Sequence, residues 1–192
     1  MLILIGGLAL FFGPHFFSAV RSREAGQDVR AKNEGLYMGL YSLISLAGFV
    51  MIIYGYGFTR GAGVVYVPPT WMQHLNLLLM IPAIILLVAS QIPAGYLKRV
   101  SKHPMLVAVK LWAVGHLLAN GELNSVILFG SFLVFAVFDR IMVKRRGDGG
   151  GAAAAEVSVM WDVVAAAVGL GLYLALLLWL HPILFGVYAL PA

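Results

Sequence analysis

Five histidines lie in or beside hydrophobic segments of this 192-residue chain, which contains no cysteine. His15 and His116 are the most informative, because each falls inside an apolar run long enough to cross a bilayer, where a polar ring is costly. Two neutral imidazoles that face each other across a helix bundle would suit axial ligation of a haem iron. In the simpler interpretation, each ring bonds to a neighbouring helix and only helps the helices to pack.

Three further side chains suit the anionic groups of such a cofactor. Lys110 lies about one and a half turns before His116, where its ammonium could meet a haem propionate or simply extend to the interface. Arg140 could bind a propionate or a phosphate with two hydrogen bonds. His103 stands in a basic segment, so we expect a phosphate or propionate contact, or simple solvation, rather than metal ligation. The other two histidines fall at the predicted outer interface, where amphipathic rings need no function: His74 and His181.

The composition fixes the class of protein. Hydrophobic residues make up 61% of the chain and charged residues 11%, whereas a soluble domain averages roughly 45–50% and about 25%. The chain is therefore a membrane protein, in contact with the lipid bilayer. The lack of cysteine excludes disulfides, thiolate catalysis, iron–sulfur clusters and cysteine-based zinc sites. The net charge of +5 is explained by topology-setting basic loops rather than by nucleic-acid binding.

Six apolar runs predict an all-α, polytopic bundle of about six transmembrane helices. They cover residues 2–20, 37–56, 72–92, 104–120, 123–143 and 158–188. The first run resembles a signal peptide, but it has no basic start and no A-x-A-like site follows it, so we expect a transmembrane helix. The fourth is short for about 30 Å of hydrocarbon. In the sixth, Pro182 is expected to kink or break the helix near its end.

Basic residues alternate between the loops. They gather after the first, third and fifth spans, which predicts that these loops are cytoplasmic and that both termini are periplasmic, in a bacterial inner membrane. The segment 147–157 is rich in glycine and alanine and reads as a flexible cytoplasmic linker within a single domain over 1–192. Homo-oligomerisation is left open.

Three segments resemble a known family. GLYSLISLAG, HPMLVAVKLWAVGHLLANG and LFGSFLVFAVFDR are similar to the NnrU family of bacterial membrane proteins. That family is related to plant 15-cis-zeta-carotene isomerase, an integral membrane enzyme that binds haem b through two histidines. The resemblance implies that His15 and His116 ligate haem iron, and His103 also matches a family histidine.

The resemblance leaves three functions open. The first is a redox-gated cis-trans isomerase that acts on a lipid-soluble polyene. The second is a non-enzymatic, haem-dependent sensor or assembly factor for nitrite and nitric oxide respiration, since the family name implies a denitrification context. The third comes from a broader likeness of the KHP-to-NG stretch to isoprenylcysteine methyltransferases, which would work without haem. Those enzymes carry an acidic C-terminal motif, which the single aspartate of the last span does not supply.

Overall fold

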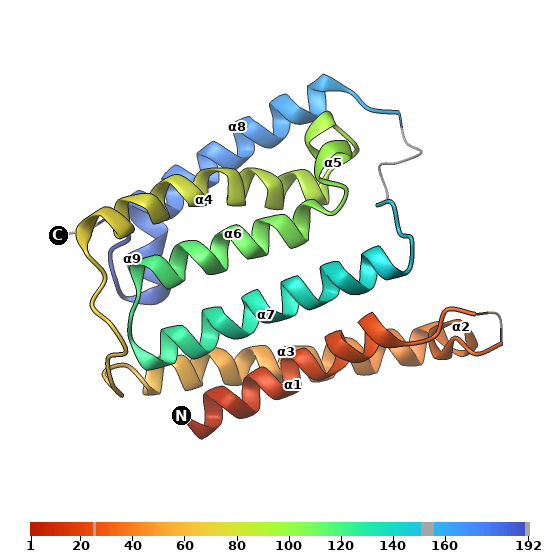
Figure 1. The fold of residues 1–192 in the computed structure, drawn as a ribbon, viewed down its shortest axis with the longest axis horizontal. Helices are drawn as coiled ribbons and strands as arrows, with labels where there is room; N and C mark the ends of the chain where they lie inside the picture. The colour runs from red at the N-terminus through yellow and green to blue at the C-terminus, as the bar shows by residue number, and fades with distance from the viewer. Residues whose placement is uncertain (25, 151–155, 191–192) are drawn as a thin grey trace. The chain divides into compact units, whose positions relative to one another are not determined.

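The computed structural model describes residues 1–24, 26–150 and 156–190 of the chain. Its long elements are α-helices (Figure 1). Five helices are long and apolar enough to cross a membrane, and a sixth, over residues 104–119, is apolar but shorter. The expected helical membrane bundle is confirmed. By their contacts, the residues group into two compact units, each assembled from separate stretches of the chain. The expectation of one domain over 1–192 stays a prediction.

The first unit comprises residues 1–66 and 122–146. It contains α1 (Leu2–Val20), the short α2 (Val29–Lys32), α3 (Glu34–Phe58) and α7 (Leu123–Arg145). Helix α1 packs along α3 and also against α7. Pro14 lies inside α1 without ending it.

Glycines bring the backbones of α1 and α3 together. A Cβ atom on Gly48 would lie 2.8 Å from the carbonyl oxygen of Gly7 and would also clash with the backbone nitrogen of Phe11. A Cβ on Gly55 would lie 2.5 Å from the backbone nitrogen of Leu4. Small residues allow membrane helices to approach this closely, and the pair is then held by van der Waals packing rather than by a hydrophobic effect. The position of α1 therefore depends on these glycines.

The second unit comprises residues 67–121 and 147–192. Its long helices are α4 (Thr70–Gln91), α6 (Pro104–Ala119) and α8 (Val159–Ala175), and α4 packs against both of the others. The short helix α5 (Tyr96–Ser101) joins α4 to α6. Helix α6 begins at Pro104, whose missing N–H is tolerated in a first turn. It spans only about 24 Å at 1.5 Å per residue.

The last span is not one regular helix. After α8, residues Leu176–Leu180 form a π-helical turn, η1, and α9 (His181–Phe185) follows and ends at Gly186, whose φ is 69°. The sequence predicts a break caused by Pro182, and the structure places that proline in the first turn of α9, directly after the π-helical turn.

The two described ends of the predicted linker make specific contacts. The carbonyl oxygen of Asp148 accepts a hydrogen bond from Nε2 of His103 at 3.2 Å, and Gly150 packs against the carbonyl group of Lys102. The backbone N–H of Ser158 donates to the carbonyl of Ala94 at 3.1 Å. Residues 151–155 lie outside the described part of the chain. The stretches on either side of them are thus anchored to the ends of α5.

Candidate functional site

His15 lies two-thirds of the way along α1, in the first unit. Its Nδ1 atom is 2.6 Å from the carbonyl oxygen of Phe11, one turn earlier. Because a carbonyl can only accept, this contact requires the proton on Nδ1. The other ring nitrogen, Nε2, then carries the lone pair. Within the described residues, no hydrogen bond to Nε2 is found.

Aromatic rings from three helices surround His15. Its ring stacks on Phe11 with 4.4 Å between the centroids and lies 5.0 Å from Tyr41 of α3 and 5.7 Å from Phe135 of α7. Asp139 of α7 is close enough to interact electrostatically with the imidazole. The imidazole is therefore surrounded by aromatic rings, with the acidic Asp139 nearby. Aromatic residues of α7 recur every three positions, a helical spacing visible in the sequence, and pack against rings of α1. Phe135 lies against His15, Phe132 against Phe12 and Phe138 against Phe16.

His116 stands in the last turn of α6, in the second unit. Its Nδ1 atom is 2.9 Å from the carbonyl oxygen of Trp112, which again requires the proton on Nδ1. The carbonyl oxygen of His116 in turn accepts two hydrogen bonds from Asn120, one from its backbone N–H and one from Nδ2, both 2.9 Å long. The predicted helix end at Asn120 is confirmed. This cap fixes the backbone that carries the imidazole.

The small residues beside His116 are used for helix packing. The sequence suggests that Ala113 and Gly115 leave room for a flat ring or for another helix. The structure places α4 there: a Cβ on Gly115 would lie 2.5 Å from Oδ1 of Asn76 and 2.6 Å from Cε of Met80. Ala113 is fully buried. The Oδ1 atom of Asn76 is buried and has no hydrogen-bond partner among the described residues, so this contact leaves one acceptor unused beside the histidine's helix.

The other predicted ligand-binding residues are distributed over both units. Lys110 lies half-buried on α6, and Arg140 lies half-buried near the end of α7. His103 is engaged with the backbone of Asp148, as described above. His181 is also bonded to the backbone, because its Nδ1 donates to the carbonyl of Val187 at 2.7 Å. It is also close enough to His116 to interact with it electrostatically, a proximity that the sequence does not predict.

An ion pair closes the loop after α1. Arg21 binds the carboxylate of Asp28, and its guanidinium lies 5.5 Å from the ring centroid of Tyr37. The hydrogen bond from Arg21 holds the pKa of the Asp28 carboxyl below its usual range. Asp28 also accepts from the backbone N–H of Arg30 and so caps α2. Arg21 and Asp28 are therefore joined by charge between α1 and α2.

Each of the two imidazoles could supply one ligand to a haem iron, because haem supplies four nitrogen ligands itself and needs one or two from the protein. Within the described residues, no group of three or more His, Cys, Asp or Glu side chains is found that could hold a metal ion. Ligating histidines usually donate their second ring nitrogen to a carbonyl or carboxylate. His15 and His116 both have Nδ1 engaged in this way, so Nε2 would be the nitrogen that binds iron. The two residues belong to different units.

Comparison with known protein families places the chain in context. A family model described as "NnrU protein" matches residues 3–189, nearly the whole chain. No curated protein and no solved structure matches.

Proposed function

Since the chain belongs to the NnrU family, we propose that it is a haem b-binding membrane protein in which His15 and His116 would hold the haem iron. The observation that supports this proposal is the matching geometry of the two imidazoles. Each sits on an apolar helix with Nδ1 donating to the carbonyl four residues earlier. This bond selects one tautomer and one ring orientation. In our proposal, Lys110, Arg140 and His103 supply the cations that face the propionates.

The activity that we propose is cis-trans isomerisation of a lipid-soluble polyene, gated by the oxidation state of the iron. Bound haem would supply the redox-dependent activation of the double bond. The protein would exclude water and orient the substrate through apolar side chains such as Phe12 and Phe135, which already pack against His15. Large apolar side chains are exposed on every long helix, so a lipophilic molecule can approach from the bilayer.

A second candidate follows from the family itself. NnrU proteins are named in the context of nitrite and nitric oxide respiration, and a haem-dependent sensor or assembly factor would need the same two histidines. It would bind nitric oxide reversibly in the ferrous state and would not turn over a polyene. A methyltransferase-like enzyme without haem is the third candidate. It would bind S-adenosylmethionine near Lys102 and His103.

The absorption spectrum of the purified protein tests the proposal. We expect a sharp Soret band, with split low-spin bands after reduction by dithionite, and we expect His15→Ala and His116→Ala each to shift or abolish them. His74→Ala is the matched control, because this exposed histidine begins α4 and should leave the spectrum unchanged. A wild-type protein that stays colourless after haem reconstitution would refute haem binding. Equal polyene turnover in both oxidation states would refute the redox gate.

A further inference from the structure

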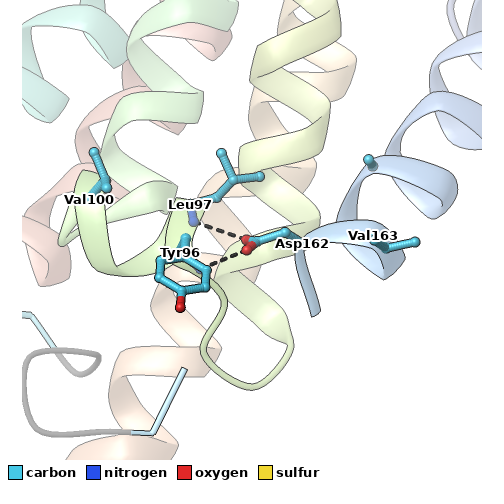
Figure 2. A pocket seen from close by; sticks show the side chains of 6 residues that line it. Tyr96, Leu97, Val100, Asp162 and Val163 are labelled. Carbon is cyan, nitrogen blue, oxygen red and sulfur yellow. Dashed lines mark hydrogen bonds between the residues drawn. The ribbon is translucent and has the colours of Figure 1, made fainter. Parts of the chain in front are cut away.

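A groove opens between the short helix α5 and the start of α8, entirely within the second unit. Its volume is about 520 Å³, and its lining side chains come from Tyr96, Leu97 and Val100 on one wall and from Asp162, Val163 and Ala166 on the other (Figure 2). It lies beside the loop that joins α4 to α6, at one end of the membrane-spanning helices. The groove is therefore placed at the level of a membrane interface.

The single charged group in the groove is already occupied. The two carboxylate oxygens of Asp162 accept the backbone N–H groups of Tyr96 and Leu97 at 2.8 and 2.9 Å (Figure 2). The rest of the lining is apolar, and it is open: Val100 is 81% exposed and Val163 is 56% exposed. Such a surface lowers its free energy by contact with hydrocarbon.

Two exposed cations lie close in sequence to Val100, which lines the groove. Arg99 and Lys102 are exposed on either side of Val100 in the sequence. Lys98 instead binds the end of α4, because its Nζ atom donates to the carbonyls of Ser90 and Ile92. An apolar floor beside two exposed cations complements a molecule with an acyl chain and an anionic headgroup.

The backbone at Lys102 is strained. Its φ is 59° and its ψ is −47°, and the N–H of His103 donates to the carbonyl of Ser101 at 2.7 Å across it. This is a γ-turn of the rare, strained kind. Glycine would adopt it at lower cost, so the lysine side chain at this position is retained at the expense of stability. Strain of this kind is typical of functional positions.

We propose that the α5–α8 groove binds an anionic phospholipid, with an acyl chain along Leu97, Val100 and Val163 and the headgroup phosphate at Arg99 and Lys102. The inference does not depend on haem. It requires only the membrane insertion that the apolar helices support.

Native mass spectrometry of the full chain in a neutral detergent tests the proposal, with titration by phosphatidylglycerol or by phosphatidylcholine of the same acyl chains. We expect tighter binding of phosphatidylglycerol, by about five-fold for each of the two cations. Arg99→Gln and Lys102→Gly should each remove about five-fold of this preference. Lys102→Gly should also unfold at the same or a higher temperature than wild type, because it relieves the strained turn. Ala166→Phe, which fills the groove, should weaken binding of both lipids.

Arg145→Gln is the matched control, since this exposed arginine ends α7 and does not line the groove. It should keep the full preference. Equal binding of the two lipids to wild type would overturn the proposal, and so would a preference that survives in both groove variants. A loss in Arg145→Gln as large as in Arg99→Gln would show that overall charge, and not the groove, selects the lipid. Displacement of bound phospholipid by a polyene at equal concentration would instead assign the groove to the proposed substrate and would also overturn the phospholipid assignment.

Discussion

The glycine contact between α1 and α3 gives the sharpest test of how the fold positions His15. In Gly48→Ala, the new Cβ would sit 2.8 Å from the carbonyl oxygen of Gly7 and against the backbone of Phe11. Both partners are backbone atoms of a helix, so no side-chain rotation relieves the clash. Ordinary van der Waals contact begins near 3.4 Å, so the two helices must separate by several tenths of an ångström along their tightly packed faces.

The expected cost follows from two opposing terms. Overpacking of this kind typically costs about 1–3 kcal/mol, while replacing glycine by alanine inside a helix gains up to about 1 kcal/mol. Gly57→Ala is the matched control, because it lies on the same helix and has no atom within 4 Å of its added Cβ. Gly57→Ala should therefore gain the stability that comes from the higher helix propensity of alanine, without any cost of overpacking. We therefore expect Gly48→Ala to be less stable than Gly57→Ala by about 1–3 kcal/mol.

Unfolding by sodium dodecyl sulfate, followed by circular dichroism in mixed micelles, measures the free energy of unfolding of each variant. The substitution also has a predicted effect on the site, since the displaced residue, Phe11, holds Nδ1 of His15 through its carbonyl. A haem-loaded Gly48→Ala variant should therefore show altered reduced bands, and Gly57→Ala should not. Equal stability of the two variants would refute the close approach of the α1 and α3 backbones at Gly48.

Three other substitutions test separate parts of the structure. Asp28 has a lowered pKa because Arg21 donates to it. Its contribution to stability is therefore present above the usual carboxyl range and is lost as the pH falls. In thermal unfolding, wild type should lose more stability than Asp28→Asn between pH 7 and about pH 3. Asp162→Ala removes the acceptor of two backbone N–H groups and should cost about 1–2 kcal/mol by detergent unfolding, with Glu156→Ala as a near-neutral control. In Gly115→Ala, the added Cβ would contact the flexible end of a methionine and an amide oxygen rather than backbone atoms. This substitution should therefore cost about 1 kcal/mol of stability, less than Gly48→Ala. A larger loss in Gly115→Ala than in Gly48→Ala would contradict this ranking.

Hydrophobic patterning predicts the elements of this fold well. The six predicted spans match the observed helices to within about three residues at most ends, because the length of an apolar run and its flanking polar residues determine where a membrane helix begins and ends. The end of α6 at Asn120 and its start at Pro104 follow from local capping preferences. The π-helical turn before His181 has no such local signal.

Contacts between distant segments are less accessible from the sequence. Asp162 reads as a residue that favours a helix N-terminus, whereas its carboxylate binds backbone N–H groups 65 and 66 positions away. The aromatic rings around His15 come from α1, α3 and α7, which must therefore pack side by side. The sequence of a single helix does not predict which other helices pack against it. Gly48 and Gly55 lie seven residues apart, on one face of α3. That spacing is the one available clue to the close helix pair.

The two proposed ligands are held in physically different ways, and this difference predicts how each variant will fail. His15 is half-buried and lies against rings of three helices, so His15→Ala removes contacts with Phe11, Tyr41 and Phe135 and should lower stability by about 1–2 kcal/mol even without a cofactor. His116 is held by backbone bonds at a capped helix end, so the cap survives His116→Ala. We therefore expect both variants to lose the haem spectrum, and His15→Ala also to lose stability as the apoprotein in detergent unfolding. An apoprotein of His15→Ala as stable as wild type would mean that His15 does not pack against the aromatic rings described above.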